Sequence, residues 1–511
     1  MARLIPAMQT EKKPAAKTAR STSAKPDSGA QKSYLRRGNR ITARATLVLT
    51  LWLGFWLLAL GLIGALSWIP FAQLYYKSSL AFSGFVAGFA ALSLVYALRP
   101  RRRGRRPEKI AIKPLPRATA EPLYAMLEHI ARKLDIEAPI EIHLIGAASA
   151  FISSKRNWYG RVQSLQVGVG LPLLSSLSNI ELGSVMAHEF GHFVAGDLSL
   201  GPWVYRTRKS LTTTVNNLDD SLFFLDIIFR LYGLWVLRLS SGVSRAQEFS
   251  ADAFAVQCFG VKATRAALEK IHLIEPMWSA YLDHELCPAI TRGSRLPVFE
   301  GFRRFCKPGV KRTEVQAAIS HAEVRPTAEF DSHPSLADRV AAMAPGATPS
   351  YPPLSECLQL VGGELAAENA WYTMFEHDEL IISDWDSYGT QILQKQIELR
   401  FADSWMAPKQ LEFSELVVMA QQVDKLWDKL RPQDVSFLSP LGKRNHVLEI
   451  LEEWITANLC HRGFTPVVKP GQALTLIRDQ QTVQPAELLK AALNGKLKSA
   501  MLAQYDLQAA A

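Results

Sequence analysis

The sequence predicts a mainly α-helical protein with a small β-sheet, placed behind an N-terminal helical hairpin long enough to cross a membrane. Three features indicate this fold class. Two uncharged apolar runs lie near the start, short alternating segments follow them, and a capped amphipathic helix begins near residue 178. A chain of 511 residues is long enough for two or three domains with a sizeable core.

The hairpin is predicted from two runs without charge, 22 residues at 45–66 and 19 residues at 80–98. Each is long enough to cross a hydrocarbon core about 30 Å thick. Residues 67–79 between them hold one charge and several aromatics, which is typical of a membrane interface. A buried core hairpin is the alternative, whereas a cleavable signal peptide is disfavoured by the polar stretch before the first run. We therefore expect a transmembrane hairpin over residues 45–98.

The net charge of +11 could indicate a nucleic-acid partner, but the positions of the charges argue against one. Residues 1–44 hold eleven Lys or Arg against two acidic residues, and six arginines lie within 99–106, directly after the second run. Basic clusters that flank apolar runs act as topology determinants. We predict a lipid bilayer as partner, no nucleic acid, both termini in the cytoplasm, and a disordered basic tail over residues 1–44.

A small sheet is predicted between the hairpin and the capped helix. Residues 120–134 have helical apolar spacing, while 140–145 and 163–169 alternate as strands do. The stretch Ser149 to Phe151 is a candidate edge strand that could bind an extended peptide by main-chain pairing, and an ordinary hairpin is the alternative.

The capped helix carries a metal-binding pattern. Ser178 and Glu181 form an S-x-x-E capping box that predicts its start. His188 and His192, in an H-E-x-x-H motif, stand at i and i+4 on one helix face, which is the separation needed to hold one zinc ion. Glu189 is placed to act as general base on water at that ion.

A second pair of polar residues follows at i and i+4, Glu248 and Asp252. Glu248 could complete a His-His-Glu zinc set with the fourth position open. Asp252 could accept a hydrogen bond from a liganding imidazole and fix its tautomer. By spacing alone, such a pair more often forms a solvated helix face.

These motifs together resemble the HtpX-like and CAAX-prenyl-protease group of membrane zinc metallopeptidases, which are gluzincins with H-E-x-x-H and a downstream E-x-x-x-D. Residues 332–340, S-H-P-S-L-A-D-R-V, are similar to the group's H-P-x-x-x-x-R segment. The resemblance implies that His333 lies near the zinc and contacts substrate or oxyanion, although a histidine before a proline is by default a turn residue. The group often has Asn-Ala-Phe where this chain has Ser149-Ala150-Phe151.

The resemblance implies a zincin-like domain that holds one Zn²⁺ per chain through His188, His192 and Glu248, with Asp252 behind them. It further implies a membrane-anchored endopeptidase whose protein substrates are membrane-associated, in a bacterial inner (plasma) membrane with the active site in the cytoplasm. A catalytically silent or chaperone-like membrane scaffold with the same fold is the alternative. Oligomeric state, substrate and regulation stay open.

Topology constrains the apolar stretch at 221–240. One crossing between His192 and Glu248 would put the ligands on opposite sides of the membrane, so crossings there number zero or two. Charged residues at 203–220 make a partner span unfavourable. We therefore expect a helix buried in protein or lying on the membrane surface.

The expected domain order is a disordered tail (1–44), the hairpin (45–98), a zinc metallopeptidase domain (107–345) and a helical accessory domain (346–511). In the last, we expect helices at 413–430 and 445–460, a hairpin at 467–477 and a helix that begins at Pro485. The five cysteines are widely spaced without C-x-x-C, which favours a reducing compartment over a disulfide framework.

Overall fold

The computed structural model is mostly helical with small sheets, as the sequence predicts at this coarse level. It describes residues 28–77, 79, 81–98, 114–157, 162–193, 225–307, 333–343, 357–374, 380–408, 415–430, 440–497 and 505. Most of the predicted basic tail (its first 27 residues) and the arginine cluster at 99–106 lie outside these ranges.

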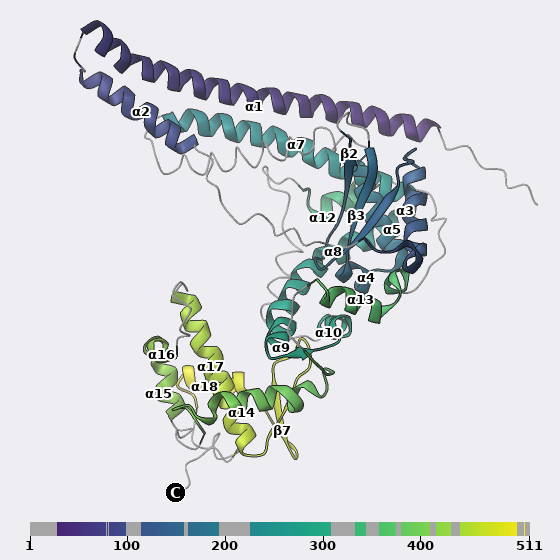
Figure 1. Ribbon diagram of the computed structural model, residues 1–511, viewed down its shortest axis with the longest axis vertical. Coiled ribbons are helices and arrows are strands. Elements are labelled where there is room, and N and C mark those ends of the chain that lie inside the picture. The colour runs from purple at the N-terminus through teal and green to yellow at the C-terminus, as the bar shows by residue number, and fades with distance from the viewer. Residues whose placement is uncertain are drawn as a thin grey trace, which may run out of the picture.

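The N-terminal helices form a hairpin. Helix α1 (Ser28–Lys77) is 50 residues long, and α2 (Phe82–Leu98) folds back beside its outer end (Figure 1). Gln73 ties the two together, because its amide donates to Ser83 Oγ over 2.9 Å. Within the described ranges, Thr46–Tyr76 is long and apolar enough to cross a membrane, while Phe82–Leu92 is a shorter apolar segment. Two spans therefore stay a prediction.

Helix α7 (Leu225–Phe259) runs alongside α1 and continues into the sheet-containing part of the molecule (Figure 1). In its first half, a buried face packs against α1, and the Tyr232 hydroxyl donates to the Leu51 carbonyl over 2.7 Å. The residues at this contact are Val236, Leu237 and Val243 of α7 with Val48, Phe55 and Ala59 of α1. How residues 225–240 lie relative to a bilayer stays a prediction.

The first sheet has the order β1-β3-β2 (β1 Ile140–Ile145, β2 Ala150–Arg156, β3 Val162–Gly170). β1 pairs parallel to β3 and β2 pairs antiparallel to it, with Phe151 opposite Gly168. Alternating residues of β1 and β3 turn one face toward the core: Ile142, Leu144, Leu165, Val167 and Val169 are all buried. Helices α3 (Glu121–Arg132), α4 (Leu171–Ser176) and α5 (Asn179–His192) complete this layer. The predicted helix at 120–134 and the two predicted strands are confirmed within a few residues.

A second group of helices packs below the sheet through an aromatic cluster. It comprises α8 (Val261–Tyr281), π-helical turn η3 (Leu282–Leu286), α9 (Cys287–Thr291) and α10 (Val298–Phe305). The 3₁₀ turn η1 (Arg117–Thr119) lies before α3, and α12 (Leu336–Ala341) packs against α7 and α8. Tyr281 is fully buried and its hydroxyl donates to the Val298 carbonyl over 2.9 Å. Rings of Trp278, Phe302 and Phe305 surround it, and Phe299 stacks on Trp278.

The C-terminal residues begin against this cluster and end in a separate lobe (Figure 1). Trp385 Nε1 donates to the Pro297 carbonyl over 2.9 Å, and the Tyr372 hydroxyl bonds to the backbone of Leu296. Because residues 357–393 share the preceding core, a domain boundary at residue 345 stays a prediction. The elements are η4 (Cys357–Val361), α13 (Glu364–Tyr372), β5 (Ile381–Ile382, parallel to β4, Ser294–Arg295) and π-turn η5 (Gly389–Leu393).

The lobe itself contains α14 (Gln394–Ala402), α15 (Leu416–Gln421), α16 (Val423–Leu430), α17 (Pro440–His461), α18 (Pro485–Leu493) and the sheet β6-β7-β8 (Thr465–Val467, Thr475–Arg478, Gln481–Val483). The helix that begins at Pro485 and the hairpin at 467–477 are confirmed. The predicted helix at 413–430 is interrupted at Gln422, whose φ of −116° leaves the helical region.

Candidate metal centre

Helix α5 is fixed at its start by the predicted capping box. The Ser178 hydroxyl accepts from the Glu181 N–H, and the Glu181 carboxylate accepts from the Ser178 N–H over 2.8 Å. Lys270 of α8 adds an ion pair to the same carboxylate at 2.7 Å. The buried residues Leu182, Met186 and Phe190 hold one face of α5 in the core. This arrangement places His188 and His192 on the last turn.

Three of the predicted site residues converge between α5 and α7. The Nε2 atoms of His188 and His192 face each other at 3.0 Å. The Glu248 carboxylate lies 3.4 Å from His188 Nε2 and 3.7 Å from His192 Nε2. Among the described residues, these three are the group of His, Cys and acidic side chains whose donor atoms gather closely enough to hold a metal ion.

Asp252 lies directly behind His188, as the spacing predicts. Its Oδ1 is 2.9 Å from His188 Nδ1. A carboxylate accepts but does not donate, so Nδ1 carries a hydrogen, and Nε2, which faces Glu248 and His192, is the ring atom available to a metal ion. Asp252 is only 3% exposed, which makes its orientation of the imidazole insensitive to solvent. The tautomer of His188 is therefore the one that a metal ligand needs.

Arg339 supplies the counter-charge for this buried carboxylate. Its Nε and NH2 groups donate to the two oxygens of Asp252 over 2.8 and 2.6 Å, in a bidentate pair. NH2 also lies 3.4 Å from the Glu248 carboxylate. The sequence analysis assigned no role to Arg339. Its position as the last residue of the H-P-x-x-x-x-R segment was the sequence feature that could have indicated one.

His333 contacts the group through Glu248. Its Nδ1 lies 2.7 Å from Glu248 Oε1, and its side chain is 73% exposed. The bond to Glu248 outweighs partial burial and raises the pKa of His333. His333 therefore stands beside the three converging groups, as the resemblance implies.

Burial and pairing set the charges of the site. Burial opposes protonation of His188, but its hydrogen bonds to Asp252 and Glu248 prevail and raise its pKa to about 9. Burial also opposes ionisation of Glu248 and Asp252, yet bonds to His188, His333 and Arg339 hold both carboxyl pKa values below their usual range. Burial raises the pKa of Glu189, which makes this carboxylate a stronger base.

The donor set fits a divalent metal ion. Bonds of about 2.0–2.1 Å in tetrahedral geometry place neighbouring N and O donors about 3.3 Å apart. The donor separations of 3.0, 3.4 and 3.7 Å bracket that value. Two imidazoles and one carboxylate, with an outer carboxylate on the first imidazole, form a donor set that suits a divalent metal ion with one position left open.

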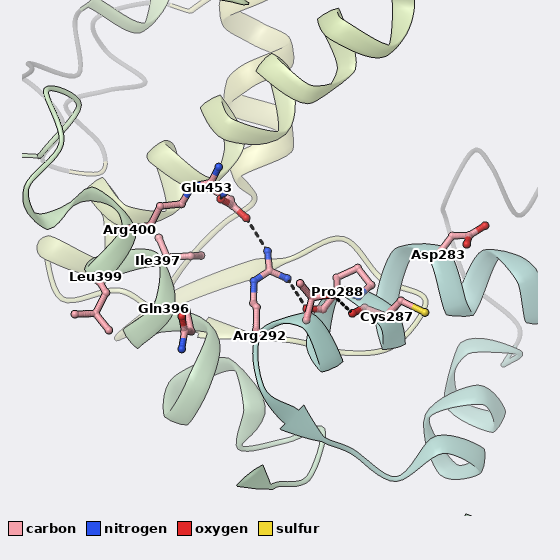
Figure 2. Close-up of a pocket in the computed structure, with 10 residues that line it drawn as sticks. Asp283, Cys287, Pro288, Arg292, Gln396, Ile397, Leu399, Arg400 and Glu453 are labelled. Atoms are coloured by element: carbon pink, nitrogen blue, oxygen red, sulfur yellow. Dashed lines mark hydrogen bonds and ion pairs between the residues drawn. The ribbon is translucent and has the colours of Figure 1, made fainter. Parts of the chain in front are cut away.

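A separate cavity of about 790 Å³ lies between α9, α14 and α17, and it includes none of these residues. There, Arg292 donates to Glu453 over 2.6 Å, and Arg400 pairs with the same carboxylate (Figure 2). Because Arg292 belongs to the aromatic-cluster region and Glu453 to the lobe, this triad links the two parts.

The comparisons with known proteins agree with this geometry. Residues 117–345 match the sequence model of peptidase family M48. Protease HtpX of Hahella chejuensis (strain KCTC 2396) is 28% identical over 230 residues, which cover 42% of this chain and 69% of that protein. No solved structure matches the chain. The region that matches this family model, residues 117–345, contains all of the converging side chains.

Proposed function

We propose that this protein is a membrane-anchored, zinc-dependent endopeptidase of the gluzincin type. The observation that carries the proposal is the convergence of His188, His192 and Glu248, with Asp252 fixing the tautomer of the first imidazole. The apolar segment Thr46–Tyr76 supports membrane anchoring by its length and composition. It belongs to α1, which packs against α7, and α7 bears Glu248. The same helix thus connects the apolar segment to the metal centre.

In this proposal, His188, His192 and Glu248 hold zinc, which when bound supplies a Lewis acid for the scissile carbonyl. Glu189 takes the proton of the attacking water and passes it to the leaving amine. His333 donates to the developing oxyanion. Arg339 and Asp252 keep the His188 ring in place and touch no substrate.

An extended substrate has a strand to pair with. In the order β1-β3-β2, one side of β2 has no neighbouring strand in the described part of the chain. Its Phe151 is 40% exposed, and the ring lies flat over Gly168, where an added Cβ would stand 2.1 Å from it. Main-chain pairing along this edge would align a peptide independently of most of its side chains. We propose membrane or membrane-associated proteins as substrates, because the anchor confines the domain to the bilayer surface.

Metal analysis of purified protein tests the proposal. The wild type should hold about one zinc per chain, and a His188→Ala/His192→Ala variant should hold none. Asp252→Ala should weaken binding by roughly 10–100-fold, as loss of an outer partner does. His446→Ala on α17 is the matched control and should keep its zinc. Full zinc occupancy without both motif histidines would overturn the site.

A further inference from the structure

The two ligand-bearing pentapeptides meet at their fourth residues. On α5 the sequence is His188-Glu-Phe-Gly191-His192, and on α7 it is Glu248-Phe-Ser-Ala251-Asp252. Gly191 lies against Ala251, and Gly183, eight residues earlier on α5, lies against Phe259, eight residues later on α7. Helices α5 and α7 are therefore antiparallel. The Gly191–Ala251 contact lies between the His188–His192 pair on α5 and the Glu248–Asp252 pair on α7.

This contact is closer than a side chain would permit. A Cβ added to Gly191 would lie 2.8 Å from Ala251 Cα and 3.2 Å from Ala251 Cβ. The obstructing atom is backbone, and Ala251 is fully buried, so it cannot swing aside. Because ordinary carbon contacts begin near about 3.5 Å, α7 would have to move by more than half an ångström.

Such a movement of α7 would change the distances from Glu248 to the two histidines but not the distance between the histidines. The separation of His188 and His192 is set within α5, whereas both distances to Glu248 cross from α5 to α7. Glu248 is 6% exposed and is already bonded to His333, so its side chain has little freedom to follow. Metal sites tolerate deviations of only about 0.2 Å in ligand distance.

We infer that Gly191 and Ala251 are positioning residues, whose close contact sets the distance at which α7 presents Glu248 to the two histidines. The inference rests on the proposed zinc site. In this inference, Gly191 of the motif has a role in metal geometry through its contact with α7. The formation of helix α5 by itself does not require a glycine at this position.

Paired glycine variants test this role. Gly191→Ala and Gly183→Ala lie on the same helix, face the same partner and gain the same helix propensity. They differ because Gly183 faces the ring of Phe259, about 12 Å along α5 from Gly191 and about 7.5 Å from His188. Zinc affinity would be measured by chelator competition, and thermal unfolding would be followed with and without zinc. Cobalt-loaded protein reports ligand geometry through its visible spectrum.

Gly191→Ala should weaken zinc binding by roughly 10–100-fold and alter the cobalt spectrum in a protein that still folds. Gly183→Ala should keep the wild-type affinity and spectrum, whatever its unfolding temperature. Should Gly191→Ala fail to fold, Ala251→Ser on the other side of the contact carries the test, with weaker binding expected. Wild-type affinity in the variants at this contact, or equal weakening by Gly183→Ala, overturns the inference. A wild type without zinc would instead refute the proposed function.

Discussion

At the scale of single residues, the site depends on one buried cation. Arg339 is 6% exposed and forms a bidentate pair with Asp252, which in turn orients His188. Removing one partner of a buried pair leaves the other charge desolvated, which costs far more than breaking an exposed pair. Arg303 offers the contrast, because it binds both oxygens of Glu364 with 44% of its side chain exposed.

We therefore predict that Arg339→Ala lowers the free energy of unfolding by about 3–5 kcal/mol, whereas Arg303→Ala lowers it by about 1 kcal/mol or less. Thermal and urea unfolding of the detergent-solubilised protein would measure both. Equal effects of the two substitutions would show that Arg339 does not carry a buried charge pair.

Spacing in the sequence identified the residues that converge, but it could not find all of their partners. His188 with His192, and Glu248 with Asp252, follow from i, i+4 geometry on two helices, which the structure brings together. The role of Arg339 and the Gly191–Ala251 contact both depend on how separate helices pack against one another. The periodicity of a single helix gives no information about this packing.

At the scale of elements, α5 owes its position to its first turn. Glu181 accepts from the Ser178 N–H and from Lys270. Burial disfavours its charged form, but these bonds prevail and lower the pKa of the Glu181 carboxyl. A carboxyl with a lowered pKa in the folded state stabilises the fold above its unfolded pKa of about 4.3, and this contribution is lost as the pH falls.

We predict that Glu181→Gln lowers the unfolding temperature at pH 7 and that the difference from wild type shrinks as the pH falls below about 4.3. Unfolding temperatures measured between pH 3 and 7 would test this. Glu269→Gln breaks the exposed pair with Arg265 on α8 and is the control, with little effect expected at neutral pH. A Glu181→Gln difference that does not depend on pH would contradict the assignment.

Helix α7 is the element that the sequence described least well. From the sequence, residues 221–240 were expected as a helix buried in protein or lying on the membrane surface, and Glu248 and Asp252 as part of a later helix at the metal site. In the structure the two are one 35-residue helix, because residues 241–247 continue the helical geometry without a break. Its apolar face changes partner along its length, from α1 to α5, and no single periodic window predicts such a change.

At the scale of the whole molecule, the hairpin predicts where the site lies. Both basic flanks favour the cytoplasm, so we expect residues near Gln73 outside and the metal centre inside. A membrane-impermeant thiol reagent should label Gln73→Cys in intact cells. The native exposed cysteines Cys287 and Cys306 should remain unlabelled until the cells are opened, and they serve as internal controls. Labelling of Cys287 in intact cells would reverse the topology.

The division of the chain into domains was predictable only in part. Motifs delimit the peptidase region, and helical spacing indicates the C-terminal helices. The aromatic contacts of Tyr372 and Trp385 with the preceding core join residues distant in sequence, so they leave no local pattern. The pairing of α1 with α2 as a helical hairpin was predictable from two charge-free runs, while the crossing of a bilayer by both helices stays a prediction.

The proposed function requires that this protein cut peptide bonds with Glu189 as the base. Zinc-loaded wild type and Glu189→Gln would be compared for zinc content and for cleavage of an unstructured protein such as casein. A glutamine keeps the shape but cannot take a proton at neutral pH, so zinc should be retained while the rate falls by about 10²–10⁴-fold. Cleavage by Glu189→Gln at the wild-type rate, or no cleavage by the zinc-loaded wild type, would contradict the account.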